Sequence, residues 1–166
     1  MKTLFIALRA AIFGSGFILL WGWVALGLHH RYDTSLGFAL AGWTRVLGVA
    51  LMAAGGTLAF ACVATFVARG EGTPAPFDPP RKFVAAGPYK FVRNPMYVGV
   101  LAMVLGEAAL YRAGVLLGYA GALLLTFHLF VVTYEEPTLR RKFGASHERY
   151  CASVPRWLPR LRPWIG

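Results

Sequence analysis

Two apolar runs in the second half of the chain decide the fold: PMYVGVLAMVLGEAALY at residues 95–111 and VLLGYAGALLLTFHLFVVTY at residues 115–134. Only Arg112-Ala113-Gly114 separates them, so they predict a tight hairpin of two helices. The second run has the length of a membrane span, about 20 residues. The first is shorter, and tilt or local thinning of the bilayer would let it cross. The sequence therefore predicts helices that are solvated by lipid.

Two further apolar runs lie closer to the N-terminus, at about residues 4–28 and 46–68. The first is longer than the apolar core of a signal peptide, about 7–15 residues, and no small-residue cleavage site follows it, so we expect a retained helix. The second run contains small residues that could form a packing seam, because they let helices approach closely in lipid; these are Gly48, Ala53, Ala54, Gly55 and Gly56. The predicted fold is all-α and polytopic, with about four transmembrane helices in a single domain over residues 1–166.

Composition and charge support a membrane protein over a nucleic-acid-binding one. Hydrophobic residues make up 57% of the chain and charged residues 14%, whereas soluble domains carry about 25% charged residues. The net charge is +10, but the basic residues lie between apolar runs instead of forming a soluble polar face. We therefore expect no nucleic-acid partner. Cys62 and Cys151 form neither a disulfide framework nor a metal-binding spacing.

The distribution of the basic residues predicts an orientation. If both termini lie on one side, only Arg31, Arg45 and Arg112 of the 17 Lys and Arg residues fall on the opposite side. The positive-inside rule then places the termini, the polar stretch 69–94 and a helical C-terminal segment in the cytosol. Because of its Pro and Gly content, most of this polar stretch is not expected to form a regular helix. The localisation that we expect is the bacterial inner membrane, with multiple spans.

Arg93-Asn94-Pro95 forms the first candidate site. Asn suits a helix N-cap and Pro the first helical position, and the free N–H groups of such an end attract a carboxylate or phosphate. Arg93 adds a planar positive fork suited to a carboxylate. The alternative is that Arg93 anchors to lipid headgroups while Tyr89 and Tyr97 belong to an interfacial aromatic belt.

Glu135-Glu136-Pro137 forms the second candidate site, at the expected end of the fourth apolar run. Acidic side chains are disfavoured at a helix C-terminus, and neighbouring carboxylates repel each other. Pro137 could begin a new helix, and a nearby cation would offset the remaining cost, with Arg93 as the candidate. The alternative is a pair of solvated acids at the membrane boundary.

Other polar residues in the apolar runs give weaker signals. Glu107 lies inside a predicted span and is therefore a candidate functional residue, although it could also extend to the outer boundary near Arg112. His128 is better explained by packing than by metal binding, and no spacing of His or carboxylates indicates a metal site. Neither Gly14-Ser15-Gly16 nor Gly70-Glu71-Gly72 lies between a strand and a helix, as a dinucleotide-binding turn would.

Both candidate sites resemble motifs of one family. Residues 87–99 resemble the pattern G-P-Y-x-x-V-R-H-P-x-Y-x-G, and residues 135–156 resemble E-E-x-x-L-x-x-x-F-G-x-x-Y-x-x-Y-x-x-x-V-P. These patterns are typical of the isoprenylcysteine carboxyl methyltransferase family, to which phospholipid N-methyltransferases are related. The resemblance covers a motif-bearing core at residues 87–156, about half of the chain.

The resemblance implies a membrane methyltransferase that uses S-adenosylmethionine and takes a lipophilic acceptor from the bilayer, either the carboxylate of a prenylcysteine-like substrate or the amine of a lipid. It implies catalytic roles for Arg93 and Glu136. It also implies a cofactor pocket at the cytosolic face, whose residues would be Tyr89, Asn94, Tyr97, Gly99 and Glu135.

Two positions depart from the family patterns. Asn94 replaces a histidine, and since Asn cannot titrate, a proton-transfer role at that position is in doubt. His147 replaces a tyrosine. The alternative function is a non-catalytic membrane accessory protein that retains the fold.

Overall fold

A computed structural model describes residues 2–32, 42–69 and 83–165, and the side chains from residue 8 onward except that of residue 10. Every regular element in these ranges is a helix. The four long helices are α1 (Lys2–Arg31), α2 (Trp43–Arg69), α3 (Pro95–Tyr111) and α4 (Gly114–Phe130). Three described stretches are long and apolar enough to cross a membrane, namely Ala11–Arg31, Trp43–Arg69 and Gly114–Phe143, whereas α3 is shorter. The predicted all-α, membrane-type fold is confirmed. Residues 70–82, half of the polar stretch 69–94, lie outside the described residues.

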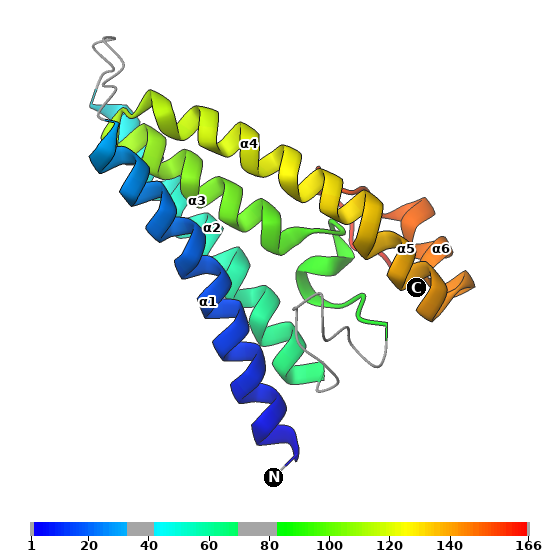
Figure 1. Ribbon diagram of the computed structural model, residues 1–166. Coiled ribbons are helices and arrows are strands. Elements are labelled where there is room, and N and C mark those ends of the chain that lie inside the picture. The colour runs from blue at the N-terminus through cyan, green and yellow to red at the C-terminus, as the bar shows by residue number, and fades with distance from the viewer. Residues whose placement is uncertain (1, 33–41, 70–82, 166) are drawn as a thin grey trace.

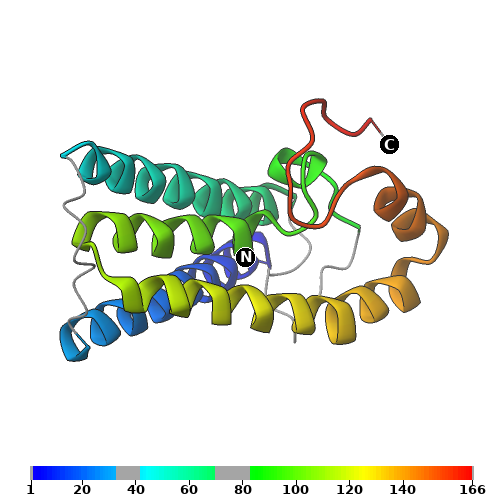
Figure 2. The ribbon, with the colours of Figure 1, turned by 90° about the horizontal axis from the view of Figure 1, so that it is seen from above.

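Helix α3 is the central element of the bundle. It contacts α1, α2 and α4, and the two ribbon views place it between α2 and α4 (Figures 1 and 2). At its C-terminal end Arg112 adopts a left-handed conformation with a φ of 56°, and the Ala113 N–H donates to Ala108 O at 3.1 Å. This turn reverses the chain into α4, as the short separation of the two apolar runs predicts.

Glycines hold α3 against α2. A Cβ atom at Gly55 would lie 2.5 Å from Gly99 O, and one at Gly48 would lie 2.7 Å from Gly106 O, so neither position accepts a side chain. On each helix the two glycines are seven residues apart and therefore lie on the same face. The predicted small-residue seam thus contains Gly48 and Gly55. Ala53 and Ala54 are instead exposed.

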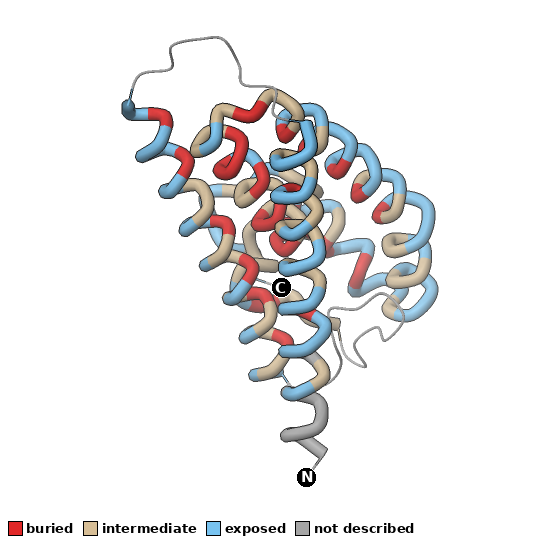
Figure 3. Tube along the Cα trace, turned by 60° about the vertical axis from the view of Figure 1, so that its left-hand side comes forward, coloured by how far each residue is buried: buried red, intermediate tan, exposed pale blue. Residues whose placement is uncertain are grey.

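The outward faces of the helices are strongly apolar. Exposed residues lie along the outside of the bundle and buried ones along its inside (Figure 3), and the exposed group includes Leu19, Trp23 and Phe60. Such surface suits lipid better than water. Glu107 is different, because it is 5% exposed and so does not extend from the bundle to the membrane boundary.

The helix formed by the fourth apolar run continues beyond the end of that run at Tyr134. A π-helical turn, η2 (Val131–Glu135), joins α4 directly to α5 (Glu136–Phe143), and α6 (Ala145–Ser153) follows. Pro137 has no N–H for the preceding turn, and its ring crowds the carbonyl four residues earlier. A single π-helical turn inside a longer helix, as here, accommodates such a disturbance. The resulting rod of 30 residues is about 45 Å long, longer than the hydrocarbon core of about 30 Å. Glu135 and Glu136 therefore lie within a continuous rod, which corrects the expectation that they lie at a helix C-terminus.

Candidate functional site

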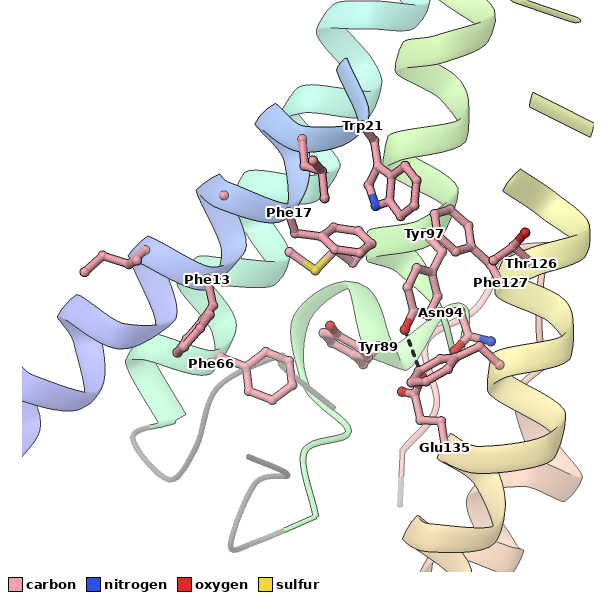
Figure 4. A pocket seen from close by; sticks show the side chains of 15 residues that line it. Phe13, Phe17, Trp21, Phe66, Tyr89, Asn94, Tyr97, Thr126, Phe127 and Glu135 are labelled. Carbon is pink, nitrogen blue, oxygen red and sulfur yellow. Dashed lines mark hydrogen bonds between the residues drawn. The ribbon is translucent and has the colours of Figure 1, made fainter. Parts of the chain in front are cut away.

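A cavity of about 580 Å³ lies on the side of α3 away from the glycine seam. Residues of α1, α3, α4 and the 3₁₀ turn η1 (Gly87–Lys90) contribute to its wall, together with Phe66 of α2. Figure 4 shows the side chains converging from these elements. Its lining is largely aromatic: Phe13, Phe17, Trp21, Phe66, Tyr89, Tyr97, Phe127 and Phe130. Mostly apolar pockets of this size with a few polar groups are typical of small-molecule sites.

Polar groups gather at one end of the cavity. The Tyr97 hydroxyl donates a hydrogen bond of 3.1 Å to Glu135 Oε2, and Tyr89 and Asn94 lie beside this pair (Figure 4). Burial is the main cause that raises the pKa of Tyr89 well above its usual value, so its hydroxyl stays protonated. Among the described residues that line the cavity, Glu135 is the only one with a formal charge.

Glu136 points to a different set of partners from its neighbour. Its Oε1 accepts hydrogen bonds of 2.8 Å from Arg93 Nη1 and from Arg156 Nε, and its Oε2 accepts one of 2.9 Å from Arg156 Nη2. The Arg156 contact is the two-pronged pairing that a planar guanidinium favours. This hydrogen bonding to Glu136 is the main cause that raises the pKa of Arg156. The side chain of Glu136 is 19% exposed, so this ion cluster is partly shielded from water.

The chain after α6 completes the site. The Arg93 N–H donates to Pro155 O at 3.0 Å, and Asn94 Nδ2 donates to Arg156 O at 3.1 Å. Trp157 Nε1 donates to His128 Nδ1 at 3.2 Å, which gives His128 the packing role expected from the sequence. Three neighbouring residues of this segment therefore fix the start of α3 and the middle of the α4–α5 rod relative to each other.

The structure brings six of the seven residues proposed from the sequence to one end of the bundle. Tyr89, Asn94, Tyr97 and Glu135 line the cavity. The ion pair of Arg93 with Glu136 lies beside it. Asn94 occupies the N-cap position of α3 as expected, but its side chain makes no capping hydrogen bond, because it is bonded to the carbonyl of Arg156.

Gly99 has a different setting. It lies in the seam with α2, where an added Cβ would be 2.8 Å from Gly55 O, and it is not among the cavity-lining residues. The close approach of two helices explains this glycine without a ligand. Its assignment to the cofactor pocket therefore has no geometric support.

Sequence reasoning assigned no role to Arg156 or to the aromatic residues of α1. Arg156 directly follows the V-P that ends the second pattern, and its partner could be recognised only once the fold placed it beside Glu136. Phe13, Phe17 and Trp21 recur every four residues, which places them on one face of a helix. That spacing is a signal which could have indicated an aromatic wall.

His147, where the family pattern has tyrosine, is buried in α6. Its Nε2 lies 3.4 Å from Cys151 Sγ. Burial is the main cause that lowers its pKa, while the charge of Glu136 opposes that shift and those of Arg93 and Arg140 add to it. The residues that the structure describes contain no group of three or more His, Cys, Asp or Glu that could hold a metal ion.

Comparison with known families gives one match. The sequence model of a phospholipid methyltransferase family matches residues 43–146, a range that contains α2 to α5 and all residues proposed for the site. No curated protein and no solved structure matches the chain. The match ends before Arg156, so the segment after α6 that completes the site lies outside it.

Proposed function

The chain belongs to the phospholipid methyltransferase family, and from this premise we propose that it transfers a methyl group from S-adenosylmethionine to a lipophilic acceptor. The observation that carries the proposal is the cavity on α3, whose apolar wall ends at Glu135 and at the Arg93–Glu136–Arg156 cluster. The cavity offers surfaces for an apolar chain and, at one end, the carboxylate of Glu135 with the ion cluster beside it for a polar cofactor.

The residues present suit this cofactor. When bound, it supplies a methyl group on a positively charged sulfur and leaves as a neutral thioether. Aromatic faces and a carboxylate that is partly shielded from water attract such a cation, and Glu135 with Tyr97 and Phe127 provides them. The buried Nε of Arg93 has no hydrogen-bond partner among the residues that the structure describes, and this donor suits the carboxylate of the amino-acid end of the cofactor.

The acceptor would reach the cavity from the bilayer between α1 and α4. Ile12 and Leu20 on α1 and Thr126 on α4 line the cavity and are also exposed on the surface of the bundle. The cavity is therefore in contact with the surface that lipid would cover. An acyl or prenyl chain could remain in lipid while its reactive end lies near Glu135.

The charges favour an amine over a carboxylate as the acceptor. Glu135 would repel a carboxylate on the acceptor. Arg93 Nη1 and Arg156 are paired with Glu136, and the remaining donor, Arg93 Nε, is assigned above to the carboxylate of the cofactor. An amine must lose a proton before it attacks, and a carboxylate is a suitable general base. In this proposal Glu135 takes the proton and leaves the nitrogen lone pair free. Arg93 and Arg156 hold Glu136 and thereby fix the rod that carries Glu135.

Methyl transfer to extracted lipid tests this function. The purified protein in lipid nanodiscs is incubated with S-adenosylmethionine carrying a tritiated methyl group and with a total bacterial lipid extract. We expect label in the organic phase, and we expect it to survive treatment with base. Label that base releases as volatile methanol would identify a methyl ester and overturn the amine assignment. No transfer to any lipid fraction would favour the non-catalytic alternative.

The orientation remains part of the proposal. The excess of Lys and Arg at the end of the bundle that carries the site supports a cytosolic location of that end, where S-adenosylmethionine is available. The labelling of Ser146→Cys, at the exposed start of α6, by a membrane-impermeant maleimide tests it. Labelling only after the cells are opened supports a cytosolic site, whereas labelling of intact cells contradicts it.

A further inference from the structure

The segment that follows α6, residues 154–165, exposes an unusual amount of apolar surface. Leu158 is 78% exposed, Leu161 is 99% exposed and Ile165 is 88% exposed. Arg160 and Arg162 lie between them in the sequence. Basic residues interleaved with exposed aliphatic ones are typical of elements that lie in a membrane interface.

This segment is held in place along its length. The Arg160 N–H donates to Phe91 O at 2.9 Å and the Trp164 N–H donates to Lys90 O at 3.0 Å. The ring of Trp164 packs edge-on against Tyr150 with 5.3 Å between centroids. The aliphatic side chains are therefore held outward by a fixed backbone.

The same segment borders an open hollow of about 640 Å³ lined by Ser153, Arg160, Arg162, Pro163, Trp164 and Ile165. Arg160 Nη1 donates to Ser153 O at 3.0 Å. Within the described part of the chain, neither arginine of the hollow forms an ion pair with a carboxylate. Two guanidinium groups without an acidic partner, beside a tryptophan and a hydroxyl group, suit a phosphate.

We propose that residues 154–165 dock on the surface of the leaflet that surrounds the bundle, with Arg160 and Arg162 on the phosphates of anionic lipids and Leu158, Leu161 and Ile165 in the acyl boundary. The choice of lipid as the occupant follows from position and charge. The segment is bonded to the turn before α3, at the end of a bundle whose outer faces suit lipid. A surface with positive charge and exposed aliphatic groups is complementary to an anionic leaflet.

Docking would also affect the geometry of the candidate site. The carbonyl of Pro155 accepts from the Arg93 N–H, and Arg156 holds Glu136. A membrane contact only a few residues further along the chain would restrict the motion of both. This consequence rests on the proposed function, whereas the docking itself does not.

A fluorescent probe at Leu161 tests the docking. The Cys151→Ser background removes the partly exposed thiol, and Cys62 is 0% exposed, so a nitrobenzoxadiazole maleimide reacts at Leu161→Cys. The matched control is Ser146→Cys at the exposed start of α6. The turn between α5 and α6 lies further from helices α1 to α4 than the segment after α6 does (Figure 2). Both variants are placed in nanodiscs that contain phosphatidylglycerol, and quenching by brominated acyl chains is compared with quenching by iodide in water.

We expect brominated chains to remove about half of the emission at position 161 and little at position 146, as for a residue buried just below the headgroups. A basic residue near an anionic surface strengthens attachment about fivefold, so replacing phosphatidylglycerol with phosphatidylcholine, or introducing Arg160→Gln with Arg162→Gln, should weaken the lipid quenching. If iodide quenches position 161 as strongly as position 146 in the anionic nanodiscs, the proposal is wrong and the surface is left for a soluble partner. Lipid quenching that phosphatidylcholine and the double variant leave unchanged would overturn the role of the arginines.

Discussion

On the α2 side of α3, glycines bring two backbones so close that no Cβ fits, whereas on the α1 and α4 side aromatic side chains surround a cavity of about 580 Å³. One helix thus has a closed face and an open face. The closed face fixes the position of α3, and the open face presents Tyr97 to Glu135. A tightly packed scaffold on one side is what allows a rigid, preformed site on the other. Substitutions on the two faces should therefore have separable effects on stability and on turnover.

The largest expected effect is on the open face. Glu135→Gln should lower kcat for methyl transfer about 10²–10⁴-fold, the usual contribution of a general base, because the amide cannot take the proton of the acceptor amine. Thermal unfolding should change little, since the amide oxygen can still accept from Tyr97. Turnover of tritiated methyl donor is the measurement, and the control is Glu148→Gln, because the Glu148 side chain is 60% exposed. Equal turnover in both variants would show that Glu135 is not the general base.

Glu136→Gln should have the next largest effect. The amide loses the negative charge that holds Arg93 and Arg156, so the rod that carries Glu135 shifts relative to α3. A displacement of about 1 Å can lower a rate about 10²-fold. Turnover and the Kd for S-adenosylmethionine should be measured together, since this variant should weaken both. A variant with normal turnover would mean that the ion cluster is structural only.

On the closed face, Gly55→Val should destabilise the protein without a specific effect on chemistry. Overpacking typically costs about 1–3 kcal/mol, and the upper end is expected here because the new Cβ meets the backbone at Gly99 O. The matched control is Gly56→Val, whose Cβ would meet no neighbouring atom within 4 Å and which should be nearly neutral. Unfolding in sodium dodecyl sulfate, followed by tryptophan fluorescence, measures both. Similar midpoints for the two variants would contradict the glycine seam.

The smallest effect concerns His147. Burial lowers its pKa, so the folded state favours the neutral imidazole. Its contribution to stability should be complete above the unfolded pKa of about 6.5 and should decline as the pH falls from there through the lower folded value. His147→Phe should therefore lose less thermal stability than the parent between pH 7.5 and pH 5. A parent and variant with the same decline in Tm would show that other groups cause it.

The helices could be predicted from the sequence because long apolar runs, and the Pro and Gly residues that bound them, determine the local backbone structure. The motif around Asn94-Pro95 likewise placed the start of α3 correctly. The path through Glu135 and Glu136 could not be predicted, because a proline shortly after an apolar run can either mark the end of a helix or be accommodated by a π-helical turn. A glycine at position 99 is expected both where a ligand approaches the helix and where a neighbouring helix does, so the sequence could not distinguish these two roles. Arg156 required the tertiary fold, since 20 residues separate it from Glu136.

Isothermal titration with S-adenosylmethionine tests most directly whether the open face of α3 is a methyl-donor site. The protein in lipid nanodiscs should bind one equivalent, with a Kd between about 1 μM and 1 mM, the usual range for enzyme ligands. Glu135→Gln should weaken binding by removing the charge that faces the sulfonium, whereas Glu148→Gln should leave it unchanged. Absence of binding by the parent protein in both nanodiscs and detergent, with the fold intact, would contradict the account.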